Sequence, residues 1–118
     1  MFHYEAFKNH TSQSYNQTIN SFDVDRFVRS VESAKAGYII FVIGQHWGRY
    51  CAPNRAYEKL LGVENGVWTS KRDLIKEIGE QLAKRDIKLI IYMTARAPMR
   101  HYQIIKAMGD TLPSINGK

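Results

Sequence analysis

The polar and aromatic stretch over residues 44–54 holds the side chains of this sequence that are best suited to chemistry. It reads Gly-Gln-His-Trp-Gly-Arg-Tyr-Cys-Ala-Pro-Asn and directly follows six apolar residues, 38–43. An imidazole such as that of His46 can donate a hydrogen bond to a ligand hydroxyl, or act as a general acid or base. The alternative is a loop histidine that only hydrogen-bonds within the protein. Residue type alone leaves both open.

Four aromatic residues crowd the same region of the chain: Trp47, Tyr50, Tyr57 and Trp68. Aromatic rings offer flat apolar faces with a polar edge, which suits the stacking of sugar rings. Rings that only pack the loop together are the alternative. The composition therefore favours carbohydrate among small ligands without excluding a structural role.

Other site chemistries fit the sequence poorly. Gly44 and Gly48 flank the stretch, but it lacks the Lys-Ser or Lys-Thr pair of a phosphate-binding loop and the spacing of a dinucleotide site. Cys51 and His46 could form a nucleophilic thiol–imidazole pair, yet a single buried cysteine without a catalytic role is the commoner case. The four histidines share no metal-ligand spacing: His3, His10, His46 and His101. We expect neither a metal nor another cofactor.

Strands must position these side chains, and the sequence predicts three of them. Residues 38–43 are all β-branched or aromatic and lie between glycines, which favours a parallel strand covered on both faces. Residues 87–93 predict a second buried strand, and residues 1–4 a short first one. The carboxyl ends of parallel strands carry binding and catalytic groups. A site is therefore expected at His46 and its neighbours.

Helices are expected over residues 23–36, 70–86 and 98–108, each with apolar residues at helical spacing. Asp23 can cap the first helix and Ser70 with Asp73 the second, while Ala36-Gly37 supplies a left-handed end to the first.

Between these helices, residues 9–20 are predicted to be a polar loop and residues 44–69 a long connection. The alternation of strand and helix implies an α/β fold of parallel βαβαβα units, with residues 1–118 as a single partial domain. A closed barrel needs at least about 200 residues, so the chain is either a small open α/β domain or the first three units of a (β/α)8 barrel.

Charge and hydropathy limit the partners. Seventeen Lys and Arg against eleven Asp and Glu give a net charge of +6, which could attract nucleic acid or acidic glycans. The basic residues are scattered among acidic ones without a Lys/Arg-rich block, so nucleic-acid binding is disfavoured. Apolar runs are far shorter than the roughly 18 residues of a membrane span, and residues 1–4 have no signal character. We expect a cytoplasmic protein without a membrane partner.

Several motifs point to one family. They are His3-Tyr4, Phe22-Asp23, Ala36-Gly37-Tyr38, the Gly-Gln-x-x-Gly-x-Tyr-Cys-x-Pro-Asn loop of residues 44–54, and Ser70-x-Arg72-Asp73-Leu74 through Lys88-Leu89-x-x-Tyr92. Together they resemble the amino-terminal part of the catalytic barrel of α-L-fucosidase-like glycoside hydrolases, in a divergent bacterial branch. The resemblance covers roughly four fifths of the chain.

The resemblance implies a retaining glycoside hydrolase fragment in which His3 and His46 contact a fucoside-like glycan. The full candidate substrate-binding set is His3, Gln45, His46, Trp47, Tyr50 and Asn54. The nucleophile and the acid/base of the family correspond to positions beyond Lys118, so no catalytic residue is expected in this chain. Two alternatives remain: a non-catalytic carbohydrate-binding remnant, and a basic α/β module that binds nucleic acid. Unpaired sheet edges also predict self-association.

Overall fold

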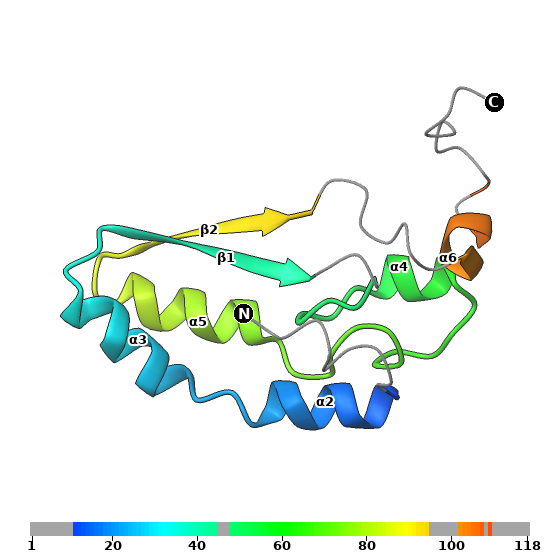
Figure 1. The fold of residues 1–118 in the computed structure, drawn as a ribbon, viewed down its shortest axis with the longest axis horizontal. Helices are drawn as coiled ribbons and strands as arrows, with labels where there is room; N and C mark the ends of the chain where they lie inside the picture. The colour runs from blue at the N-terminus through cyan, green and yellow to red at the C-terminus, as the bar shows by residue number, and fades with distance from the viewer. Residues whose placement is uncertain (1–10, 45–47, 95–101, 108, 110–118) are drawn as a thin grey trace.

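The computed structural model describes residues 11–44, 48–94, 102–107 and 109, which form a small α/β fold (Figure 1). The elements in chain order are α2 (Ser12–Asn20), α3 (Val24–Ser33), β1 (Tyr38–Gly44), α4 (Arg55–Leu60), α5 (Leu74–Ala83), β2 (Lys88–Met93) and α6 (Tyr102–Ala107). None of the helices in this described part is long and apolar enough to cross a bilayer.

The two strands pair in parallel, which confirms the predicted strand direction. The register runs from Tyr38 opposite Lys88 to Val42 opposite Tyr92, followed by an irregularity before Gly44 pairs with Met93. Within the described residues this is an open two-stranded sheet, and no barrel is seen. The strand expected over residues 1–4 lies outside the described residues, so the central position of β1 stays a prediction.

Among the described residues, helices cover one face of this sheet. Helices α3 and α5 lie together beneath β1 and β2 (Figure 1), and Ile39, Phe41 and Leu89 pack against the core on that side. On the other face, Tyr38 is 59% exposed, Ile40 61% and Tyr92 50%. The prediction that both strands are buried on both faces is therefore wrong for the described fold, because strand residues alternate between faces and only one face has a covering layer.

Helix α3 begins where the sequence predicts, after the capping residue Asp23, whereas α5 begins at Leu74, later than the expected start at residue 70, because Asp73 rather than Ser70 caps it. The carboxylate of Asp23 accepts a hydrogen bond from the amide of Arg26 at 2.9 Å, and that of Asp73 from the amide of Lys76 at 3.0 Å. Ser70, expected to share the second cap, instead donates to the Arg72 carbonyl at 2.6 Å. The apolar stripes of both helices are buried: Val24, Val28, Leu74, Ile78 and Leu82.

The prediction of a loop over residues 9–20 is wrong, because the structure contains α2 over Ser12–Asn20. The Thr11 side chain caps this helix by accepting from the amide of Ser14 at 3.2 Å. Tyr15 and Ile19, one turn apart, are both buried in the core. Two apolar residues on one face are enough to bind a polar helix to a core, since the polar residues can face water.

Arg72 fastens α2 to α5. Its Nη1 donates to the carbonyl oxygens of Ile19, in the last turn of α2, and of Phe22, just after that helix, both at 2.9 Å. Its Nη2 donates to the carboxylate of Glu77 on α5 at 2.6 Å. One planar guanidinium thus pairs with carbonyl groups at the end of α2 and with a carboxylate on α5.

Candidate functional site

The carboxyl ends of β1 and β2 meet at one edge of the sheet, where the hydroxyl of Thr94 donates to the carbonyl of Gly44 at 3.2 Å. The chain after β1 folds back across this edge. Tyr50 forms an antiparallel bridge with Gly44 and a parallel bridge with Thr69. Gly44 is needed here, because a Cβ atom would lie 2.4 Å from the carbonyl oxygen of Arg49. We call residues 48–69 the β1 loop.

A buried carboxylate holds the β1 loop together. Glu58, on α4, is 1% exposed. Its Oε1 accepts from the amides of Thr69 at 2.7 Å and Trp68 at 2.9 Å, and its Oε2 accepts from the amide of Gly66 at 3.0 Å. Burial by itself raises the pKa of the Glu58 carboxyl, but the hydrogen bonds from these amides outweigh it, and the net pKa lies below its ordinary value. The group is therefore ionised at neutral pH and acts as an internal anion.

Arg49 makes a second set of contacts that hold the β1 loop. Its Nη1 donates to the carbonyl oxygen of Val67 at 2.7 Å. Its guanidinium carbon lies 4.3 Å from the ring centroid of Trp68 and 5.5 Å from that of Tyr15 on α2. Burial lowers the pKa of Arg49, although the guanidinium stays charged because its ordinary pKa is so high. The stacked cation links the β1 loop to α2.

Two tyrosines of the β1 loop pack on each other. The rings of Tyr50 and Tyr57 meet edge to face with centroids 5.2 Å apart, and the hydroxyl of Tyr57 donates to the carbonyl of Gly48 at 2.8 Å. Burial raises the pKa of both phenols. These rings, like that of Trp68, contact groups of the loop itself, so packing accounts for part of the aromatic content that the sequence shows.

Helix α2 supplies a further anchor through Asn16. Its Nδ2 donates to the carbonyl of Gly66 at 3.0 Å, and its Oδ1 accepts from the amide of Lys71 at 2.8 Å. Sequence reasoning missed Asn16, Arg49 and Glu58 as organising residues. The neighbouring residues in the sequence do not show that a single polar side chain will make such contacts. The signal closest to them is the Asn65-Gly66 pair, which predicts a turn and which these contacts surround.

The predicted sugar-binding residues fall into two groups. His3, Gln45, His46 and Trp47 lie outside the described residues. Tyr50 and Asn54 lie together in the β1 loop. Tyr50 is buried, whereas Asn54 is exposed and its Oδ1 caps α4 by accepting from the amide of Tyr57 at 3.0 Å. Their contacts with a sugar stay a prediction.

The cysteine of the β1 loop is poorly suited to nucleophilic chemistry. Cys51 is fully buried in the core cluster, and burial raises the pKa of its thiol to about 12. A thiol with so high a pKa holds its proton at neutral pH and is a weak nucleophile. The described residues also contain no group of three or more His, Cys, Asp or Glu side chains that could hold a metal ion.

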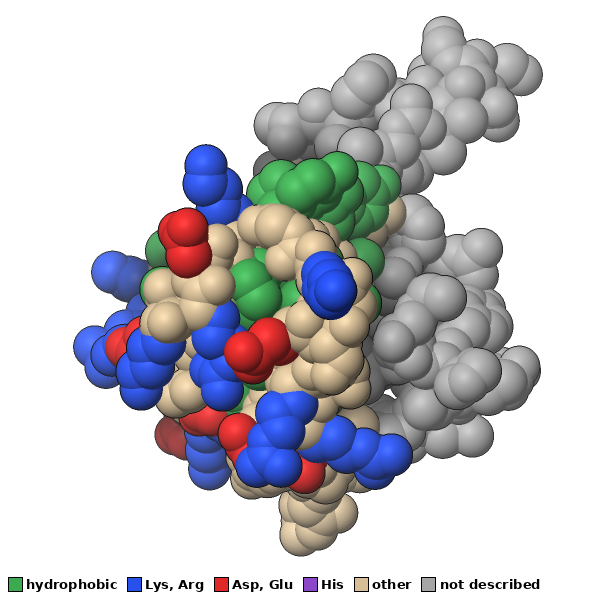
Figure 2. Space-filling view, turned by 90° about the vertical axis from the view of Figure 1, so that its left-hand side faces the viewer, with side chains coloured by type: hydrophobic (Ala, Val, Ile, Leu, Met, Phe, Trp, Pro, Cys, Tyr) green, Lys and Arg blue, Asp and Glu red, His purple; other side chains and the backbone are tan. Residues whose placement is uncertain are grey.

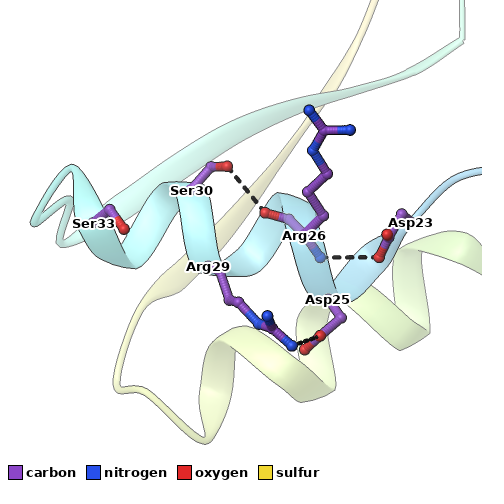
Figure 3. Close-up of a pocket in the computed structure, with 6 residues that line it drawn as sticks. All are labelled: Asp23, Asp25, Arg26, Arg29, Ser30 and Ser33. Atoms are coloured by element: carbon purple, nitrogen blue, oxygen red, sulfur yellow. Dashed lines mark hydrogen bonds and ion pairs between the residues drawn. The ribbon is translucent and has the colours of Figure 1, made fainter.

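A surface hollow lies over α3, lined by Asp23, Asp25, Arg26, Arg29, Ser30 and Ser33 (Figure 3). Three of its charged side chains already have partners within the helix: Asp25 pairs with Arg29, and Asp23 caps the first turn. Basic and acidic side chains are interspersed over the neighbouring surface (Figure 2). This hollow has the character of a solvated helix face rather than of a ligand site.

Comparisons of the chain with family models, with curated proteins and with solved structures found no match. The features of the described residues that bear on function are the carboxyl edge of the sheet and the anchored β1 loop beside it.

Proposed function

We propose that this chain binds carbohydrate at the carboxyl end of β1, as the opening βα units of a barrel resembling those of α-L-fucosidase-like glycoside hydrolases. The observation that supports this most is the β1 loop, which is fixed over the carboxyl edge of a parallel sheet by Glu58, Arg49 and Asn16. Parallel α/β folds place their ligands at that edge. A loop held by so many internal contacts is preorganised, which lowers the entropic cost of binding.

The chemistry of the segments that follow the strands favours a neutral, hydroxyl-rich ligand. Residues 45–54 supply His46, Gln45 and Asn54 as hydrogen-bonding groups and Trp47 as a flat ring, and they contain no acid. Neutral donors and acceptors beside an aromatic face match a sugar ring. The interspersed charges on α3 favour neither a nucleic acid nor a membrane surface as a partner.

Binding rather than hydrolysis is the activity we propose for the chain alone. Glycoside hydrolysis usually needs two carboxyl groups beside the scissile bond. Residues 45–54 and 94–101, which follow β1 and β2, contain no Asp or Glu. Glu58 is nearby in sequence, but it is buried and committed to backbone amides. Catalytic carboxylates would have to come from elsewhere in a larger barrel.

Nuclear magnetic resonance titration of the full chain with methyl α-L-fucoside tests this proposal. We expect fast-exchange shifts in the amides of residues 44–54, with no comparable shifts from the D enantiomer. His46→Ala and Trp47→Ala should each weaken binding at least tenfold. Each removes roughly one hydrogen bond between uncharged groups, or one stacking contact, from a site that excludes water. His10→Ala, a histidine outside the proposed subsite, is the matched control.

The absence of shifts with the fucoside and with a panel of other methyl glycosides would contradict sugar binding. Salt-sensitive binding of an oligonucleotide would instead favour the basic nucleic-acid module. Hydrolysis of an aryl fucoside by the chain alone would contradict the non-catalytic part of the proposal.

A further inference from the structure

The β1 loop contains an Asn-Gly pair at a turn that requires its glycine. The amide of Val67 donates to the carbonyl of Glu64 at 3.3 Å, and Gly66 has a φ of 87°, the combination found at a type II turn. A Cβ atom on Gly66 would lie 2.5 Å from Cγ of Lys71. Asn65, just before it, is exposed to water. A side chain at position 66 is thus excluded by both backbone conformation and packing.

An asparagine followed by glycine is the peptide sequence most prone to deamidation, since glycine has no side chain to hinder ring closure. The backbone nitrogen of Gly66 would attack Cγ of Asn65 and lose its proton. The Cγ–Nδ2 bond would then break, the departing NH2 group would take up a proton and leave as ammonia, and a five-membered succinimide would remain. Water then opens the ring at either carbonyl and yields aspartate or isoaspartate. Two requirements control the rate: the nitrogen must give up its proton, and the backbone must rotate to bring it to Cγ.

The structure opposes both requirements through the contacts of Gly66. Its N–H donates to Oε1 of Glu58 at 3.1 Å and to Oε2 at 3.0 Å. A carboxylate that accepts from this nitrogen stabilises the neutral N–H form and repels the deprotonated, anionic form that ring closure needs. Its carbonyl accepts from Asn16 at 3.0 Å, so the Gly66 residue is held on both sides and the backbone cannot turn freely.

We propose that Asn65 is a site of spontaneous deamidation whose reaction is held back by Glu58. The site opens when the Glu58 carboxylate releases the amide of Gly66, during local opening of the β1 loop. The product should also be harder to accommodate in the loop. Isoaspartate adds one carbon to the backbone between positions 65 and 66, and either product places a carboxylate on residue 65, directly before the Gly66 amide that donates to Glu58. The added backbone atom and the added negative charge both disfavour the original contacts.

Peptide mapping by mass spectrometry tests the proposal on the full chain incubated at mildly alkaline pH. A synthetic peptide of residues 63–69 gives the rate for the same bond without the fold. We expect Asn65 in the folded chain to convert at least roughly tenfold more slowly than in the peptide, since hydrogen bonds to a charged group must break before the loop opens. Glu58→Gln should remove most of this difference, because a glutamine amide offers one acceptor oxygen and turns an NH2 group toward the backbone donors.

Glu64→Gln is the matched control, because it makes the same chemical change one residue before Asn65 on an exposed side chain. It should leave conversion slow. Glu58→Asp keeps the charge on a shorter side chain and should fall between the wild-type chain and Glu58→Gln. Amide exchange in β1 reports whether each variant keeps its fold. Equal rates in the folded wild-type chain and the peptide would overturn the proposal, as would slow conversion in a folded Glu58→Gln variant.

Discussion

Glu58 is a buried charge that backbone amides balance. The amides of Gly66, Trp68 and Thr69 all point at its two oxygens, at distances between 2.7 and 3.1 Å. Backbone amides that converge in this way form an anion-binding nest, and here the bound anion is the Glu58 carboxylate of the same chain. A substitution of Glu58 therefore affects the hydrogen bonds of three backbone amides at once.

Glu58→Gln should lower the free energy of unfolding by about 1.5 to 3 kcal/mol, because at least one buried amide loses a charged partner. Urea denaturation at neutral pH measures this, with exposed Glu64→Gln as a control near zero. An unchanged denaturation midpoint in Glu58→Gln would show that the amides find other partners.

The effect of Glu58 should also depend on pH. The folded-state pKa of Glu58 lies below its ordinary value of 4.5, so its contribution to stability is fully present above pH 4.5 and is lost as the pH falls through the folded-state pKa. The difference in unfolding free energy between wild type and Glu58→Gln should therefore shrink only in that acidic range. A difference that stays constant down to the folded-state pKa and below it would contradict this assignment.

At the scale of elements, the chain repeats one helix–strand unit. Asp23 and Asp73 cap α3 and α5, and the strands that follow begin at Tyr38 and Lys88, which are paired with each other in the sheet. Both units reverse direction through a non-glycine residue of positive φ, Lys35 at 53° and Asp86 at 55°. The sequence favours Gly37 for the left-handed end of α3, but the reversal comes two residues earlier.

Lys35→Gly should stabilise the chain by about 0.5 to 1 kcal/mol, because a left-handed conformation strains a residue with a Cβ atom and does not strain glycine. Lys84→Gly is the matched control: Lys84 has a right-handed φ of −60°, so glycine there only adds unfolded-state freedom and should destabilise. Thermal unfolding of both variants gives the comparison. A lower midpoint for Lys35→Gly would show that the lysine side chain contributes more than the strain costs.

At the scale of the whole molecule, one face of the sheet is exposed and largely apolar in the part of the chain that the structure describes. The residues on this outer face are Tyr38, Ile40 and Val42 of β1 with Lys88, Ile90 and Tyr92 of β2, and hydrophobic side chains gather visibly at this surface (Figure 2). Each strand has one sheet partner among the described residues. An exposed apolar face with open edges favours association.

We expect the wild-type chain to self-associate with increasing concentration, and Ile40→Thr combined with Ile90→Thr to weaken this at least roughly tenfold, because each substitution removes apolar area from the contact. Threonine keeps the preference for strand. Sedimentation velocity over a concentration series measures the change, with Leu60→Thr, an exposed apolar side chain of α4, as control. A wild-type chain that sediments as a monomer at every concentration would contradict this expectation.

The sequence by itself determined the elements whose signals are local. Apolar runs of β-branched and aromatic residues specified β1 and β2, and the alternation with helices gave their parallel direction. Asp23 marked the start of α3, since a cap acts on amides two or three residues away, whereas the cap of α5 is Asp73 rather than the expected Ser70. The packing of Phe22 on Phe27, with ring centroids 5.5 Å apart, is also local, because the two residues lie on either side of the start of α3.

Only the tertiary structure decided which faces are covered and how the β1 loop is held. Helix α2 has a polar sequence, and it is fixed by the burial of Tyr15 and Ile19 against residues far along the chain. Glu58 becomes an anchor because the chain brings the amides of residues 66–69 around it, and Asn16 reaches Gly66 from α2. These contacts join residues that are distant in sequence or that turn toward each other only in the folded loop, so no local pattern encodes them.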